Sequence, residues 1–334
     1  MSSALSYNES RNYSSAQIEM IQGVVGATAD GRWGPSTVDA VERWQKDQGL
    51  SADGKVGPQT LVAMFVQART ADPGLWPVVN VGAWSGQSSL NNPNDDVAFC
   101  AAHGINRLYV VVNDHSTSRS ARDFDTFTRS KIVTLSKVAR DAGVEVHLMS
   151  WIMPHATYLR QAAEQLIPLV ADTGARSLQW DAEEPWTQAV DPPSYEEAAQ
   201  QVARELASLT VPMGVTGIGY TPADKFGPLA AVCKTLVPQC YATSGGSLKP
   251  ESAVSSCVDR WRSKGFGGAS PAWEIGLAAY RQEGIEGHTV ASAMTASLDN
   301  ARAYQFDSVV YWSLRQIRGS AEVTQVIGSI RNQG

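Results

Sequence analysis

The sequence predicts a mixed α/β protein in which a small helical domain precedes a (β/α)8 barrel. Three observations support this prediction. The chain has 334 residues, more than twice the roughly 150 residues of an average domain. A turn motif occurs twice within the segment 1–70, and eight apolar runs of strand length alternate with helical patterns in the remainder. We therefore expect a helical domain over 1–70, a linker over 71–76 and a barrel over 77–334.

The composition excludes several classes of protein. Apolar residues make up 43% of the chain and charged residues 18%, so a large core can be buried. The net charge of −6 argues against general nucleic-acid binding, which needs a basic surface. No apolar run approaches the roughly 18 residues of a membrane helix, and the N-terminus lacks the basic start and apolar stretch of a secretory signal.

The cysteine and histidine residues show no metal-binding spacing. There is no CxxC pair and no HExxH motif, so we expect no metal and no cofactor. In a chain of this size the cysteines are expected to be buried thiols, and a disulfide among the last three stays open. The four are Cys100, Cys233, Cys240 and Cys257.

The segment 1–70 contains an internal repeat. The motif DGRWGPST at 30–37 recurs as DGKVGPQT at 53–60. In each copy Asp-Gly favours a tight turn, and Gly-Pro favours the first turn of a helix. An earlier helix is expected at about 15–24, and Gly49 is expected to end the second helix. The pattern predicts a domain of three helices.

Residues 14–66, which contain both copies, resemble the peptidoglycan-binding module found at the ends of many bacterial and phage wall hydrolases. The resemblance implies that this domain binds peptidoglycan. The motif does not identify the contact residues, and position alone points to the loop Asp30–Trp33.

The strands expected in the barrel are apolar runs, as in a parallel sheet that is covered on both faces. An open, doubly wound sheet is the alternative, but no Gly-rich phosphate loop follows the first strand. The eight strands are Pro77–Trp84, Arg107–Asn113, Glu145–Ile152, Ser177–Asp181, Met213–Ile218, Thr235–Tyr241, Glu274–Tyr280 and Ser308–Leu314. Expected helices include Lys131–Ala142, Tyr158–Thr173, Tyr195–Leu209, Thr289–Ala303 and Val323–Ile330.

Aromatic and polar residues gather at the carboxyl ends of these strands, where a barrel enzyme has its active site. Flat rings stack on the apolar faces of sugars, so this composition predicts a sugar-binding cleft. Ordinary packing is the alternative for any single ring. The candidates for substrate binding are Trp84, Trp151, Gln239 and Trp312.

The segment Leu178–Trp186 carries the candidate acid. Strand alternation puts Gln179, Asp181 and Glu183 on one face, with the last two Cα atoms roughly 6.6 Å apart. Two close carboxylates repel, so the pKa of one rises and it can donate a proton near neutral pH. We expect Glu183 to be the general acid, with Asp181 assisting. The alternatives are a solvated charge cluster and a structural ion pair.

Three segments resemble glycoside hydrolase family 18, which carries D-x-E on its fourth strand, Tyr at the end of the sixth and Trp at the end of the eighth. They are Asp181-Ala-Glu183, Gln239-Cys-Tyr241 and Tyr311-Trp312. The resemblance implies that Glu183 donates the proton and that Asp181 orients the acetamide whose oxygen attacks the anomeric carbon. It implies that Tyr241 holds that oxygen and that Trp312 forms the floor of the subsite.

The match to the longer pattern of the fourth strand is partial, because Arg176, Ser177 and Gln179 stand where that family has Asp and Gly residues. Family 25 lysozymes also have D-x-E on a barrel strand, together with an Asp near the first strand that Val79–Trp84 lacks. We therefore expect a barrel of the general N-acetylhexosaminidase type that retains configuration.

Two further residues have open roles. Asp114, at the end of the second strand, orients Glu183 or a water, or else caps the following loop. Arg315 binds a carboxylate of the wall or pairs with an acidic residue on the rim.

These observations predict a monomeric peptidoglycan hydrolase without affinity for nucleic acid or membranes. We expect an endolysin that is made in the cytoplasm, acts on the wall after release and cleaves the glycan as an N-acetylmuramidase. An N-acetylglucosaminidase or chitinase-like glycosidase, a non-catalytic wall-binding or virion protein, and an amidase or peptidase are the alternatives. The last is weakest, because no GxSxG motif is present.

Overall fold

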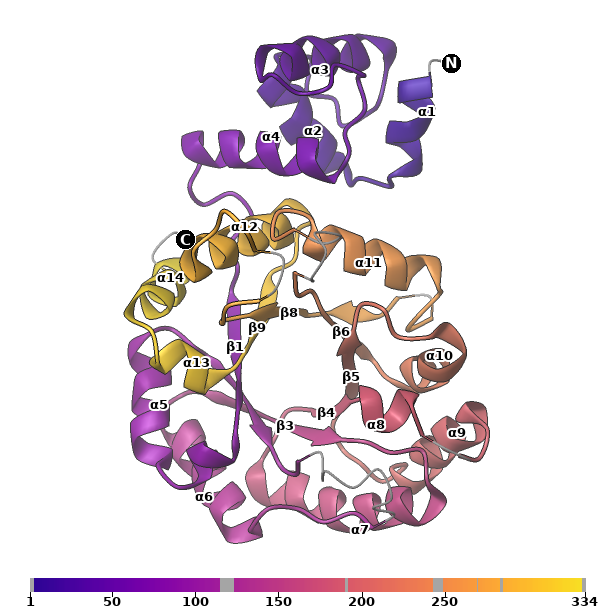
Figure 1. Cartoon of the computed structure of the whole chain (residues 1–334), viewed down its shortest axis with the longest axis vertical. Helices are drawn as coiled ribbons and strands as arrows, with labels where there is room; N and C mark the ends of the chain where they lie inside the picture. Colours follow the sequence, from indigo (N-terminus) through magenta and orange to yellow (C-terminus); the bar gives the residue numbers. More distant parts are fainter. Residues whose placement is uncertain are drawn as a thin grey trace.

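The computed structural model describes residues 3–114, 123–189, 192–242, 249–268, 270–282 and 285–331. Four helices form the N-terminal part, and a closed ring of parallel strands surrounded by helices forms the remainder (Figure 1). The predicted fold class is confirmed. Among the described residues, no helix combines the length and apolar composition needed to cross a membrane.

The N-terminal part contains the three predicted helices and one more. Ser14 caps the first predicted helix in a reciprocal pair with Gln17, and a Gly-Pro step starts each of the other two. The additional helix was not expected because SALSYNES has no amphipathic pattern, and it is fixed by the buried Asn8. The four helices are α1 (Ser3–Ser10), α2 (Ser15–Val25), α3 (Pro35–Asp47) and α4 (Pro58–Ala71).

The sequence repeat is also a repeat of contacts. Gln22 on α2 accepts hydrogen bonds from the backbone N–H groups of Asp30 and Gly31, at 2.9 and 3.0 Å. Gln45 on α3 does the same for Asp53 and Gly54, at 3.2 and 2.8 Å. Both glycines have φ of +69°, a left-handed conformation that favours glycine. One buried glutamine therefore holds each Asp-Gly turn.

Eight parallel strands close into a barrel, because β5 pairs with both β4 and β6. All eight lie where they were predicted, and the closure excludes the open-sheet alternative. A two-residue strand, β7 (Ala272–Trp273), pairs with β6 alone. The barrel strands are β1 (Asn80–Ser85), β2 (Arg107–Val111), β3 (Glu145–Trp151), β4 (Leu178–Asp181), β5 (Met213–Ile218), β6 (Thr235–Gln239), β8 (Ile275–Ala278) and β9 (Ser308–Trp312).

The helices around the barrel include the five that were predicted, although the one at 195–209 ends at Glu205. Their bounds are η1 (Gln87–Leu90, a 3-10 helix), α5 (Pro93–Ala102), α6 (Arg129–Asp141), α7 (Ala156–Thr173), α8 (Glu184–Thr187), α9 (Tyr195–Glu205), α10 (Ala223–Val232), α11 (Ala253–Ser263), α12 (Val290–Ala303), α13 (Leu314–Arg318) and α14 (Ala321–Arg331).

The barrel has two apolar layers. A large layer fills the space between strands and helices and contains Trp180, as expected for the outward face of β4. A smaller layer fills the lumen with Trp84, Tyr109, Met149 and other side chains. All four cysteines are buried free thiols, as predicted.

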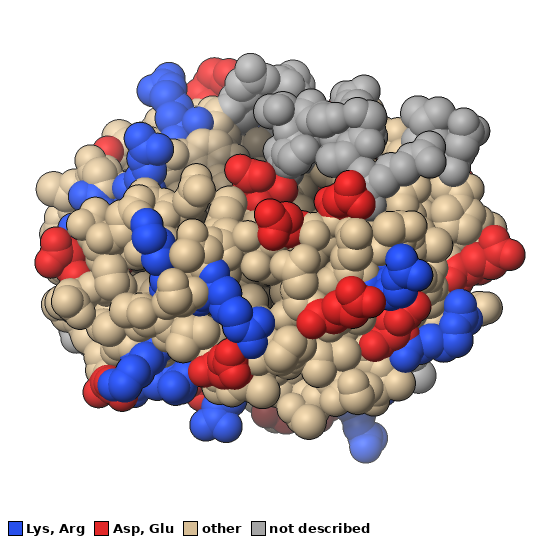
Figure 2. All heavy atoms as spheres, turned by 90° about the horizontal axis from the view of Figure 1, so that it is seen from below, with Lys and Arg blue, Asp and Glu red and all other residues tan. Residues whose placement is uncertain are grey.

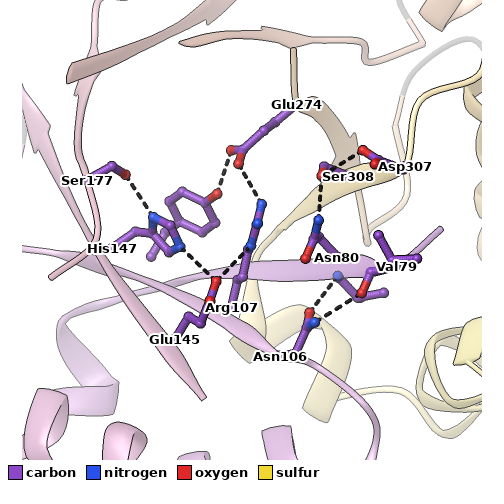
Figure 3. A network of polar contacts seen from close by, with 12 residues as sticks. Val79, Asn80, Asn106, Arg107, Glu145, His147, Ser177, Glu274, Asp307 and Ser308 are labelled. Atoms are coloured by element: carbon purple, nitrogen blue, oxygen red, sulfur yellow. Dashed lines mark hydrogen bonds and ion pairs between the residues drawn. The ribbon is translucent and has the colours of Figure 1, made fainter. Parts of the chain in front are cut away.

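A polar network fills the lumen at the amino ends of the strands (Figure 3). The carboxylate of Glu274 accepts a 2.9 Å bond from Arg107 and a 2.5 Å bond from the hydroxyl of Tyr109. The ring of His147 stacks on Tyr109, with centroids 4.6 Å apart. Burial, together with the nearby Arg107 and Arg176, lowers the pKa of His147 to about 3, so its ring is neutral.

The N-terminal helices pack against α12 and the segment after it. Gln17 donates a 2.7 Å bond to the carbonyl of Ala303, and Arg11 forms an ion pair with Asp259 on α11. On the barrel face away from these helices, acidic and basic side chains are intermixed (Figure 2).

Candidate functional site

A cavity of about 280 Å³ opens at the carboxyl ends of the barrel strands. Two carboxyl groups, five aromatic rings and three other side chains line it, and they come from seven of the strands or the turns that follow them. The lining residues are Trp84, Met149, Trp151, Asp181, Glu183, Ile218, Gln239, Tyr241, Tyr280 and Trp312. The structure thus brings together seven of the nine residues that the sequence singled out.

The two acidic residues reach the cavity in different ways. Asp181 is the last residue of β4 and is 3% exposed. The strand ends there, so strand alternation does not place Glu183, contrary to the expectation. Glu183 instead precedes α8, whose early Pro185 prevents the strand from continuing, and its side chain is half-buried. The turn into α8 therefore brings the second carboxyl to the cavity.

Burial, and then the negative charge of Glu183, raise the pKa of Asp181 well above its usual range. Both causes disfavour the ionised form of Asp181, which has little contact with water. Asp181 therefore tends to keep its proton at a pH where an exposed carboxyl is ionised. The site thus places a protonated carboxyl beside the cavity.

Gln239 connects Asp181 to the neighbouring strand. Its amide nitrogen lies 3.5 Å from Oδ1 of Asp181 and 3.4 Å from the hydroxyl of Thr216, both at the long end of hydrogen-bond range. Thr216 in turn donates a 2.8 Å bond to the carbonyl of Val237 on β6. The buried carboxyl thus has an amide donor beside it on the cavity side.

Two pairs of aromatic rings line the cavity. Trp312 lies against Trp84, with ring centroids 6.0 Å apart. Tyr241 and Tyr280, which follow β6 and β8, meet edge to face at 6.1 Å. Burial, the neighbouring Tyr280 and the acidic pair raise the pKa of Tyr241 well above its usual range, so its hydroxyl stays a hydrogen-bond donor.

Asn113, which precedes the predicted site residue Asp114, helps to position Trp151. The side-chain oxygen of Asn113 accepts a 2.9 Å bond from the backbone N–H of Trp151, and the hydroxyl of Tyr158 donates a 2.8 Å bond to the carbonyl of Trp151. Asn113 is 4% exposed. The backbone at the end of β3 is therefore fixed.

Asp114 and Arg315 are not among the residues that line the cavity. Asp114 is exposed, and the loop that it was expected to cap or face begins at 115, outside the described residues. Arg315 is exposed on α13. Three lining residues were not among the candidates. Tyr280 ends the predicted strand Glu274–Tyr280, whereas the apolar Met149 and Ile218 at strand ends carry no chemical signal.

Comparison with known proteins gives one family match. Residues 19–64 match the family described as "Putative peptidoglycan binding domain". No curated protein sequence matches the chain significantly.

Solved structures share the fold of the barrel. A family 18 chitinase from Pseudoalteromonas aurantia is 11% identical, with a TM-score of 0.54 over 76% of this chain and 100% of that chain. The spore cortex-lytic enzyme SleL of Bacillus cereus is 11% identical, with a TM-score of 0.50 over 76% of this chain and 74% of that chain. SleL of Bacillus megaterium is 9% identical, with a TM-score of 0.50 over 75% and 73%. At these identities the likeness concerns the fold.

Proposed function

We propose that this protein is a cell-wall hydrolase whose barrel cleaves the glycan strand of peptidoglycan beside an N-acetylated sugar. The observation that carries the proposal is the cavity at the carboxyl end of β4, where Asp181 and Glu183 lie among five aromatic rings. Aromatic rings suit the flat faces of a sugar, and a pair of carboxyls suits acid catalysis at a glycosidic bond. The peptidoglycan-binding match at 19–64 supports the same polymer as the substrate.

In this proposal Glu183 is the general acid. It is the more exposed of the two carboxyls, so it can reach the leaving oxygen, whereas Asp181 is almost entirely buried. Burial raises the pKa of Asp181, so Asp181 passes its proton to Glu183 as it accepts a hydrogen bond from the substrate, and Glu183 then transfers this proton to the glycosidic oxygen as the bond breaks. Asp181, ionised by then, stabilises the positive charge that develops on the substrate.

The substrate's own acetamido oxygen would attack the anomeric carbon. Asp181 would orient the acetamido N–H, and the protonated Tyr241 would donate a hydrogen bond to its oxygen. Attack from the face opposite to the leaving group, followed by attack of water on the intermediate, gives net retention of configuration. Trp312, beside Trp84, would form the floor on which the sugar rests.

We further propose the bond after N-acetylmuramic acid as the cleavage site, so that the enzyme acts as a muramidase of the endolysin type. An N-acetylglucosaminidase would need the same acid and the same acetamido nucleophile. Digestion of purified sacculi, followed by reduction and mass analysis of the muropeptides, separates the two by the sugar at the new reducing end. Products that differ only by cleaved peptide bonds would contradict a glycosidase.

The Glu183→Gln variant tests the acid directly, because it keeps the shape of the side chain and removes the titrating proton. We expect a loss of turnover of about 100-fold or more. Glu196→Gln, an exposed change on α9, is the matched control and should retain full activity. If Glu183→Gln lyses sacculi at the normal rate, Glu183 is not the acid. If the wild type releases neither reducing ends nor cleaved peptides, the protein only binds the wall.

A further inference from the structure

The two Asp-Gly turns of the N-terminal part differ in what contacts their edge. By the edge we mean the carbonyl of the glycine and the N–H of the residue two positions later. At the second turn, the side chain of Asn8 on α1 donates a 2.9 Å bond to the carbonyl of Gly54 and accepts a 2.8 Å bond from the N–H of Val56. One carboxamide reaches both groups, so the carbonyl before Lys55 and the N–H after it point to the same side. Asn8 itself is fully buried.

The first turn has the same conformation, and no described residue takes the place of Asn8 there. Its glycine has the same φ of +69°, and Arg32 N–H bonds to Asp30 at 3.0 Å as Lys55 N–H bonds to Asp53 at 2.9 Å. In the first copy of the repeat, Gly31 and Trp33 stand where the second copy has Gly54 and Val56. Within the described residues, the carbonyl of Gly31 and the N–H of Trp33 have no hydrogen-bond partner.

Two more observations concern this copy of the repeat. The indole Nε1 of Trp33 is buried and lacks a hydrogen-bond partner among the described residues. The side chains beside Gly31 are those of Ser15 and Glu19, both exposed, whereas the equivalent neighbours of Gly54 are Val38 and Ala4, both buried. The first turn therefore keeps an unpaired donor and acceptor at a buried glycine that only the exposed side chains of Ser15 and Glu19 cover, whereas α1 covers the second turn.

The stereochemistry of the pair distinguishes an extended peptide from the acetamido group of a sugar. A secondary amide is trans, so its N–H and C=O point in opposite directions, and the acetamido group of a sugar cannot satisfy both groups. One residue of an extended peptide presents its own N–H and C=O on the same side, as in a parallel β-bridge. A primary carboxamide, like that of Asn8, has the same arrangement.

We propose that the edge of the first turn binds the peptide of peptidoglycan, with a ligand N–H donating to the carbonyl of Gly31 and a ligand C=O accepting from the N–H of Trp33. This inference rests on the proposed function for the identity of the polymer. It assigns the peptide to the N-terminal helices and leaves the glycan to the barrel. Both the main chain of an extended stem peptide and an amidated side chain offer an N–H and a C=O that point to the same side.

Backbone amide resonances of the full chain test the contact. The free stem tetrapeptide, in carboxylate and amidated forms, should shift the Trp33 amide and slow its hydrogen exchange. The amide of Val56 should not respond, because Asn8 already occupies it. A response to the amidated form alone assigns the carboxamide, and a response to both assigns the main chain. Chitin oligosaccharides that shift Trp33, or peptides that leave it unchanged, would overturn the proposal.

A pair of substitutions related by the repeat provides the second test. Glu19→Trp puts a large ring beside the open turn, and Glu42→Trp puts the same ring at the equivalent exposed position on α3. We expect Glu19→Trp to weaken binding to sacculi about tenfold, since two backbone hydrogen bonds are lost, and Glu42→Trp to leave it unchanged. Equal effects of both variants, or undiminished binding to glycan stripped of peptide, would contradict the assignment. Release of reducing ends, measured separately, reports on the barrel alone.

Discussion

The indole Nε1 of Trp84 donates a 2.7 Å hydrogen bond to the side-chain oxygen of Gln179 inside the barrel lumen, and both side chains are buried. Gln179 is one of the positions where β4 departs from the family 18 pattern. Its bond crosses the lumen from β4 to β1 and fixes the ring against which Trp312 lies. The departure thus has a definite structural role beneath the cavity.

Gln179→Met should weaken sugar binding more than catalysis. The change leaves the indole N–H of Trp84 without an acceptor in a buried place, which costs about 1–3 kcal/mol of unfolding free energy. The ring then loses its fixed orientation, so KM should rise while kcat changes less. Chemical denaturation and steady-state kinetics on sacculi measure the two effects. A drop in kcat at constant KM would show that Gln179 acts on the acidic pair instead.

Asp181→Asn should change how stability depends on pH. Because the pKa of Asp181 is raised in the folded protein, its contribution to stability is complete below the unfolded pKa of about 3.9 and is lost as the pH rises through the folded value. Residue 181 cannot ionise in the variant. Its unfolding free energy relative to wild type should therefore increase as the pH rises from about 4 to 8.

Denaturation curves of wild type and Asp181→Asn over that range measure the difference, and subtraction removes the other titrating groups. The variant should also lose activity, so its stability and its activity should move in opposite directions at neutral pH. A difference that does not vary with pH would mean that Asp181 is ionised in the folded protein.

Glu274→Gln at the base of the barrel should destabilise the fold without altering the pH profile of hydrolysis. The change removes one of the two carboxylates that pair with Arg107, whose side chain is 20% exposed and also contacts Glu145 at 3.2 Å. We expect a loss of about 2–3 kcal/mol, less than for a fully buried pair. Combining it with Arg107→Met should cost less than the sum of the two single changes. An altered pH profile would indicate that this network communicates with the cavity.

The sequence predicted the barrel because most strands, covered on both faces, appear as short apolar runs such as Ser308–Trp312. It predicted the site because Asp181 and Tyr241 lie at or just after the ends of those runs. It did not predict α1, whose stability comes from the distant contact of Asn8 with Gly54 rather than from its own pattern. The position of Arg315 depends on how the chain turns after β9, which strand periodicity does not determine.

The carboxyl whose pKa is raised by burial also could not be identified from spacing. Repulsion between two carboxylates is symmetric, so the sequence favoured Glu183 on chemical grounds alone. The strand ends at Asp181, which leaves that residue inside the lumen and Glu183 in the turn beyond it. The burial of each carboxyl depends on where the strand ends. The sequence-based expectation extended the strand alternation two residues too far, to Glu183.

The contacts between the N-terminal helices and α12 have a consequence for the products. Gln17, at 6% exposed, bonds to Ala303, and Arg69 pairs with Asp299 at 3.3 Å, so a short connection is reinforced by contacts at both ends of the interface. In the proposed function, the first Asp-Gly turn binds the polymer and the barrel cavity cleaves it. A constant separation between the two sets the distance along the polymer from the bound position to the cleaved bond. Fragments should then show a preferred length, and loosening the interface with Gln17→Ala should broaden the length distribution while leaving the cut bond the same.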